Sequence, residues 1–244
     1  MIELIQGDCL EKMQDISDGS IDMILTDCPY KIVSGGCTKI PIKGETSGIL
    51  THRQTEKRTD WVDDVRTGKM FKYNSLDFSD WLPIIFTKLK KDSHAYIMIN
   101  SRNLSELQTK AEIAGFKFQN LLVWDKGNVT PNRWYMQGFE CILMLRKGKA
   151  VNINNMGTSN LLKIKNIKGI KKHPTEKPIE LMNIMIQNST NERQIILDPF
   201  MGSGSTMIAC QNLNRNGIGI ELDKNYFAIA EKRIKENENQ LKLF

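Results

Sequence analysis

Apolar positions along the chain follow two periods. Short runs of β-branched and bulky apolar residues predict strands, and recurrence at three and four residues predicts amphipathic helices. The predicted strands cover residues 2–5, 21–26, 94–100, 118–124, 139–145, 194–197 and 217–220. The predicted helices cover residues 9–16, 78–89, 104–114, 179–187, 205–213 and 226–236.

The alternation of strands and helices predicts an α/β fold with a mainly parallel, seven-stranded sheet and helices on both faces. The exception is the connection from 118–124 to 139–145, which contains Gly127, Pro131 and Gly138 but no helical pattern. We therefore expect an antiparallel pair at one edge of the sheet. A chain of 244 residues suits one such domain with insertions.

Two stretches lack a regular pattern and are rich in bases. Residues 31–75 carry nine bases and five acids, and residues 146–172 carry eight bases and no acid. Because the net charge of the chain is +6, everything outside 146–172 sums to −2. Long irregular segments inside a compact domain are usually functional or disordered. Taken alone, such concentrated charge is more typical of a solvated, lysine-rich loop; together with the acidic and aromatic turn at 27–30, described below, it favours contact with phosphates.

Composition narrows the class of protein. Hydrophobic residues make up 40% and charged residues 25% of the chain, as in ordinary globular proteins. No apolar window has the length of a membrane span, and the start of the chain lacks the pattern of a signal peptide, so we expect a soluble, cytoplasmic protein. Five scattered cysteines without a C-x-x-C pair and three histidines indicate neither a disulfide framework nor a metal site.

A glycine turn follows the strand predicted at 194–197 and leads into a helix. This turn, residues 198–206, reads DPFMGSGST. Turns at this place in α/β folds bind nucleotides, and Thr206 and the first helical amides can bond a carboxylate or hydroxyl. Met207 replaces the last glycine of a dinucleotide fingerprint, and no P-loop lysine follows. Glu221, after the next strand, is placed to bond both hydroxyls of a ribose.

Another turn, Asp27-Cys28-Pro29-Tyr30, follows the strand predicted at 21–26. It combines an acidic side chain, a stiff backbone with free carbonyls and an aromatic ring for stacking, which together suit the grip of an aromatic amine. We expect the two turns, although distant in sequence, to converge on one site.

The two turns resemble the motifs of the DNA amino-methyltransferases, which use S-adenosylmethionine and carry a (D/N/S)-P-P-(Y/F/W) turn and a D-P-F-x-G-S-G-(S/T) turn. Their order here, with a basic region between them, resembles the β group of that family. Further matches are Gly7-Asp8-Cys9, Trp124-Asp125-Lys126 and the run HPTEKP at 173–178. The resemblance implies one Rossmann-like methyltransferase domain over 1–244, with a basic insertion at 31–75 and a target-recognition region at about 126–172.

The resemblance also implies roles for residues. Glu221 would hold the cofactor's ribose, Asp8 its adenine amino group, and residues 173–178 would face its methionine part. The catalytic residues expected are Asp27, Cys28, Pro29 and Tyr30. The cofactor-binding residues expected are Asp8, Cys9, His173, Thr175, Lys177, Pro178, Asp198, Pro199, Phe200, Gly202, Ser203, Gly204, Thr206 and Glu221. The DNA-binding residues expected are Lys31, Lys39, Lys43, Lys126, Arg133, Lys163, Lys165, Lys168, Lys171 and Lys172.

Two positions depart from the family's pattern. Cys28 stands where proline is usual, but the contact from that position is a main-chain carbonyl, which cysteine also supplies. Because Pro29 still restricts the preceding residue to extended conformations, we expect activity to survive. Phe139 precedes Glu140 where relatives often have a polar residue or histidine.

The activity implied is transfer of a methyl group to N6 of an adenine flipped out of double-stranded DNA. The alternatives are cytosine N4, where serine more often replaces Asp27, and a DNA-binding module without activity. An RNA or protein glutamine substrate fits the order of motifs poorly, and Met207 disfavours a nicotinamide oxidoreductase. The β group implies a homodimer by analogy, and a cognate restriction nuclease is conceivable.

Overall fold

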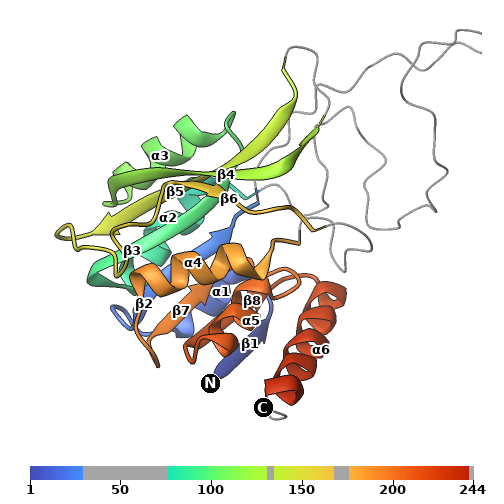
Figure 1. The fold of residues 1–244 in the computed structure, drawn as a ribbon. Coiled ribbons are helices and arrows are strands. Elements are labelled where there is room, and N and C mark those ends of the chain that lie inside the picture. Colours follow the sequence, from blue (N-terminus) through green and yellow to red (C-terminus); the bar gives the residue numbers. More distant parts are fainter. Residues whose placement is uncertain (30–75, 131–134, 168–175, 242–244) are drawn as a thin grey trace, which may run out of the picture.

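The computed structural model describes residues 1–29, 76–130, 135–167 and 176–241 (Figure 1). Its strands are β1 (Ile2–Gln6), β2 (Ile21–Asp27), β3 (Leu89–Ile99), β4 (Lys117–Thr130), β5 (Gln137–Lys147), β6 (Leu161–Lys163), β7 (Ile195–Asp198) and β8 (Asn216–Glu221). Its helices are α1 (Cys9–Lys12), continued by the 3₁₀ turn η1 (Met13–Asp15), α2 (Phe78–Lys88), α3 (Leu104–Ile113), α4 (Ile179–Ser189), α5 (Ser205–Asn212) and α6 (Lys224–Leu241). The predicted insertion at 31–75 lies outside the described residues. None of the described helices could cross a membrane.

The strands form one sheet in the order β1-β8-β7-β2-β3-β5-β4-β6. Every neighbouring pair is parallel except the two that β5 makes with β3 and β4. The mainly parallel architecture and the antiparallel pairing of β4 with β5 are therefore confirmed.

Two details of the sheet differ from the prediction. The described residues form eight strands instead of seven, because β6 pairs with β4; three residues are too few to show a strand period. The antiparallel strand is also not at the edge, since β5 returns beside β3 and displaces β4 outward. Strand order depends on contacts far apart in the sequence, and local patterns do not encode it.

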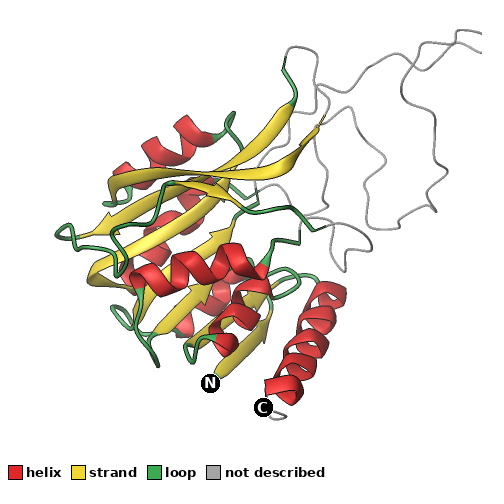
Figure 2. Ribbon diagram, in the orientation of Figure 1, coloured by secondary structure: helices red, strands yellow, loops and turns green. Residues whose placement is uncertain are grey.

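Helices cover both faces of the sheet, as Figure 2 shows. Alternate residues of each central strand point to opposite faces. On β2, Ile24 joins the core under α1, α2 and α3, whereas Met23 and Leu25 join the core under α4 and α5. α6 packs on α5 through Ala230 and Ile234. Both faces are therefore apolar, which explains the nearly continuous burial of β2.

The chain leaves β2 and β7 in opposite directions. From β7 it passes through α5 to β8 on one side, and from β2 it continues to β3 on the other. Neighbouring parallel strands whose connections diverge leave a crevice beyond their carboxyl ends, and this is where open α/β sheets bind ligands. The fold therefore places a site beyond Asp27 and Asp198.

Met207, which replaces the last glycine of a dinucleotide fingerprint, packs against β8. Met207 is fully buried, and an added Cβ at Gly219 would lie 3.0 Å from its Cγ and 2.5 Å from Met201 Sδ. At Gly217 an added Cβ would lie 2.8 Å from Met207 Sδ. The glycines that allow α5 to approach the sheet are thus on the strand.

This packing predicts a compensating pair of substitutions. Gly219→Val should lower the free energy of unfolding by about 1–3 kcal/mol through overpacking. Met207→Ala alone should cost about 2–5 kcal/mol through the cavity that it leaves. Because valine would fill part of that cavity, denaturant unfolding of the double variant should show a loss smaller than the sum. Strict additivity would contradict the contact.

Candidate active site

The two turns singled out from the sequence lie on neighbouring strands. β2 and β7 pair in parallel, with Ile24 opposite Leu197, so their carboxyl ends reach the same edge of the sheet. There Thr26 Oγ1 donates a 2.7 Å hydrogen bond to Asp198 Oδ1, across 172 positions of sequence. The expected convergence of the turns at one edge is confirmed.

Asp198 is the buried anchor of the glycine turn. Its carboxylate also accepts hydrogen bonds from Thr206 Oγ1, at 2.6 Å, and from the Phe200 amide, at 3.1 Å. Burial raises the pKa of Asp198 to about 6, although these donors and Thr26 act to lower it. The Thr206 hydroxyl thus holds Asp198 in this structure, and its contact with a cofactor stays a prediction.

The turn itself depends on two glycines. Gly202 and Gly204 have φ angles of 54° and 82°, a backbone conformation that residues other than glycine rarely adopt. An added Cβ at Gly204 would also lie 3.2 Å from Ala230 Cβ on α6. Backbone amides here can therefore approach a ligand closely. Ser205, the first residue of α5, adds a buried hydroxyl that has no hydrogen-bond partner among the described residues.

Two acids follow the neighbouring strands along the same edge. Glu221, at the end of β8, accepts hydrogen bonds from the amides of Gly202, at 3.0 Å, and Asp223, at 2.8 Å. Burial raises its pKa, and these two amides act to lower it. Asp8, after β1, caps α1 by accepting from the Leu10 amide at 2.8 Å. The Gly7 amide donates to the Glu221 carbonyl, so the segment that follows β1 lies beside the end of β8.

These groups fit an adenosine-bearing cofactor. Glu221 is a fixed acceptor for ribose hydroxyls, and the absence of side chains at Gly202 and Gly204 lets the backbone of the turn approach a ligand closely. The orphaned Ser205 hydroxyl supplies a buried donor or acceptor beside them. Phe200 lies at the same turn, held edge-on against Trp81 at 5.2 Å between ring centroids, and Pro199 before it is buried.

Asp27 belongs to a row of alternating charges. Lys177 Nζ lies 2.6 Å from Asp27 Oδ2 and 3.3 Å from Glu140 Oε2, and Lys126 Nζ lies 3.3 Å from Glu140 Oε1. Burial raises the pKa of Asp27, Lys177 acts to lower it and Glu140 acts to raise it. The pKa of Glu140 is lowered overall, because the two lysines outweigh the burial that raises it. The sequence predicted cofactor contact for Lys177 and DNA contact for Lys126, and it gave Glu140 no role.

The residue before Lys177 ties this segment to the cofactor turn. Arg233 of α6 donates to the Ser203 carbonyl at 2.7 Å and to its hydroxyl at 2.8 Å. The same guanidinium lies 2.6 Å from Glu176 Oε1, and both side chains are more than nine-tenths buried. Pro178 follows as the N-cap residue of α4. Nothing in the local pattern of α6 singled out Arg233.

The cysteines at the site are packing residues. Cys28 is 2% exposed, and its thiol donates to the Met98 carbonyl at 3.6 Å. Burial raises its pKa well above the usual value, so the thiol is protonated. Cys9 lies in the same core cluster, and burial raises its pKa to about 12. The side chain at position 28 therefore faces the core, which explains how cysteine can replace proline there.

Of the basic residues expected to bind DNA, Lys163 and Lys165 are exposed at the carboxyl end of β6. This end reaches the same edge of the sheet as Asp27, because β6 is parallel to β4, and β4 runs in the direction of β3 and β2. The side chain of Lys126 is 12% exposed. The remaining predicted residues lie outside the described part of the chain, namely Tyr30, Lys31, Lys39, Lys43, Arg133, Lys168, Lys171, Lys172, His173 and Thr175.

Comparison with known proteins agrees with this geometry. A family model described as DNA methylase matches residues 21–232. The chain is similar to Type II methyltransferase M2.DpnII of Streptococcus pneumoniae, with 30% identity over 96% of this chain and 90% of the relative. It is 28% identical to Type II methyltransferase M2.MboI of Moraxella bovis, over 96% of this chain and 87% of the relative.

Solved structures show the same relationship. The M1.HpyAVI-SAM complex is 27% identical, with a TM-score of 0.67 over 96% of this chain and 100% of that chain. PvuII DNA methyltransferase, described as cytosine-N4-specific, has a TM-score of 0.69 over 98% and 92% but only 16% identity, so it shows the fold alone. The matched family covers both turns of the site, and this chain belongs to it: the protein is an S-adenosylmethionine-dependent DNA methyltransferase.

Proposed function

We propose that this enzyme methylates N6 of an adenine that has been flipped out of duplex DNA. The observation that carries the proposal is an acid, Asp27, at the carboxyl end of β2, beside the turn that fits the cofactor. The family includes enzymes acting on adenine N6 and on cytosine N4, and serine is more usual at this position in N4 enzymes with this order of motifs. Asp27 therefore favours adenine.

The chemical task is to make a poor nucleophile reactive. The lone pair of the adenine amino nitrogen is delocalised into the ring, and hydrogen-bond acceptors on its two hydrogens localise it. We assign these acceptors to the Asp27 carboxylate and the Cys28 carbonyl, with stacking by Tyr30 as a further prediction. S-adenosylmethionine, when bound, supplies an electrophilic methyl group and needs no metal. The residues of the site hold amine and methyl in line, so positioning provides much of the rate.

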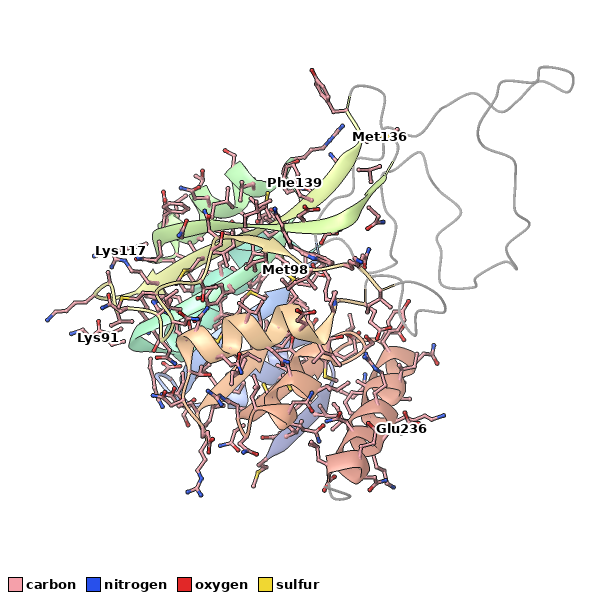
Figure 3. The ribbon with its side chains drawn as sticks, viewed as in Figure 1. Lys91, Met98, Lys117, Met136, Phe139 and Glu236 are labelled. Carbon is pink, nitrogen blue, oxygen red and sulfur yellow. The ribbon has the colours of Figure 1, made fainter. Side chains whose placement is uncertain are left out.

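Exposed groups near the site support DNA contact. The long strands β4 and β5 extend beyond the rest of the sheet, and Figure 3 shows Met136 and Phe139 on this extension. Their side chains are 64% and 48% exposed. Lys163 and Lys165 reach the same edge. Together they suit a surface that holds the duplex by its phosphates while one base leaves the stack.

The partners follow from the relatives. The names of the Type II relatives support a place in restriction and modification, with a cognate nuclease as the separate enzyme. A homodimer and a cytoplasmic location also remain predictions. Light scattering of the purified protein, with and without DNA, tests the dimer.

Replacing the assigned acceptor should abolish transfer. Asp27→Ala should slow methylation of DNA by about 10²–10³-fold or more, because the side-chain oxygens that accept from the reacting amine are lost. Binding of S-adenosylmethionine, measured by calorimetry, should persist. Asp18→Ala is the matched control, because this exposed acid pairs with Lys88 away from the site. Normal transfer by Asp27→Ala would reject the role.

The product identifies the base. Plasmid DNA treated with the enzyme and digested to nucleosides should contain N6-methyladenine, and sequencing of the methylated sites should give the recognition sequence. N4-methylcytosine would favour the other activity of the family. Absence of any methylated nucleoside, with DNA binding intact, would favour a protein that kept the fold without catalysis.

The exposed lysines should carry part of the phosphate contact. Lys163→Ala combined with Lys165→Ala should weaken DNA binding at all sequences and reduce the salt slope of log K by about 1–2. The control is Lys91→Ala with Lys117→Ala, two exposed lysines near the opposite ends of β3 and β4 (Figure 3). Equal salt slopes for the two double variants would remove Lys163 and Lys165 from the interface.

A further inference from the structure

Lys177 is held between two carboxylates at the centre of the site. Its Nζ lies 2.6 Å from Asp27 Oδ2 and 3.3 Å from Glu140 Oε2, and its side chain is 10% exposed. Glu140 is held from its other side by Lys126. Three segments meet in this contact: the end of β2, the start of β5 and the residues before α4.

We propose that Lys177 is a positioning residue for methyl transfer, which keeps Asp27 an ionised, fixed acceptor, and that Glu140 moderates this contact. The inference rests on the catalytic role proposed for Asp27. It gives Lys177 a role at the target amine, whereas the resemblance implied contact with the methionine part of the cofactor.

The two oxygens of Asp27 have different roles in this geometry. Lys177 binds Oδ2, so Oδ1 is left, among the described residues, to accept an amino hydrogen. A carboxylate pinned at one oxygen also loses rotational freedom before substrate arrives. The amine then meets an acceptor that is already oriented, which lowers the entropic part of the barrier.

The charges around Asp27 explain why a cation is needed. A protonated carboxyl is a weaker acceptor than a carboxylate, and burial, the largest influence, raises the pKa of Asp27. Lys177 opposes this effect and Glu140 reinforces it. Asp198 on β7 faces the same region, and its own pKa is raised to about 6, chiefly by burial and to a smaller extent by Asp27. The neighbouring Cys28 thiol stays neutral because its pKa is raised.

Glu140 limits how far the ion pair with Lys177 weakens Asp27 as a hydrogen-bond acceptor. A lysine bound to Asp27 alone would draw charge from the carboxylate and make it a weaker acceptor. Sharing Lys177 with Glu140, and Glu140 with Lys126, spreads the positive charge along the row. The backbone position of Lys177 is fixed from the other side, because Glu176 is paired with Arg233.

Single-turnover methylation across roughly pH 5–9 tests the inference. Asp27 must be ionised, so the rate falls as pH drops through its pKa. Lys177→Met removes the group that lowers this pKa. The acid limb of the variant's pH–rate profile, where the rate falls at low pH, should therefore shift to higher pH by about 1–3 pH units. Glu140→Gln removes a group that raises the pKa of Asp27, so the acid limb of this variant should shift to lower pH. Asp198 is unchanged in every variant, and because it interacts with Asp27 the acid limb is read as the titration of the pair; the shift between variants measures the effect of Lys177 and Glu140.

The remaining variants separate positioning from a structural role. Lys177→Arg should keep an acid limb near that of the wild type, and Lys91→Met, which removes an exposed lysine near the opposite end of β3, should change nothing. Binding of S-adenosylmethionine should be unchanged throughout. Should Lys177→Met fail to fold, Glu140→Gln still tests the coupling, because its limb must move the other way.

Each contrary result has a distinct meaning. A wild-type acid limb in Lys177→Met, or loss of cofactor binding in proportion to rate, would overturn the inference. An upward or unchanged limb in Glu140→Gln would also overturn it. Full activity in Asp27→Ala would instead overturn the catalytic role proposed for Asp27, whatever the Lys177 variants do.

Discussion

The parallel pairing of β2 with β7 is the constraint on which the active site depends. It brings the turn assigned to catalysis and the turn that fits the cofactor to one edge of the sheet, where Thr26 bonds Asp198 across 172 positions of sequence. A hydrogen bond to a charged group contributes about 1.5–3 kcal/mol, and a buried carboxylate without its donors would cost more. The bond therefore holds the two turns in one relative position, and chemistry between a methyl group and an amine requires that.

Around this pairing, polar side chains link elements that the sheet alone would leave independent. Arg233 joins α6 to Ser203 of the cofactor turn and to Glu176, and the next residue, Lys177, reaches Asp27. A continuous path of contacts thus connects the turn that fits the cofactor with the acid assigned to the target amine.

The sequence predicted the parts of the site that follow strands. Asp27, Glu221 and the glycine turn were found because each comes directly after an apolar run, and parallel strands end at a common edge. It could not predict that Lys177 contacts Asp27, because that contact joins residues 150 positions apart. The short strand β6 was missed because three residues show no strand period, and the interior place of β5 because it pairs with β3, which is distant in the sequence. Unexpected residues in the motifs had packing causes, as at Cys28, whose thiol enters the core.

A crystal structure of the enzyme with bound S-adenosylmethionine would show directly where the methyl group lies relative to Asp27. We expect ribose hydroxyls on Glu221, the backbone at Gly202 and Gly204 against the cofactor, and the sulfonium turned toward Asp27. Between methyl carbon and carboxylate there should be room for one amino nitrogen, about 3–3.5 Å from the methyl. A cofactor whose methyl group points away from Asp27, or lies beyond the reach of any base that Asp27 could hold, would contradict the account.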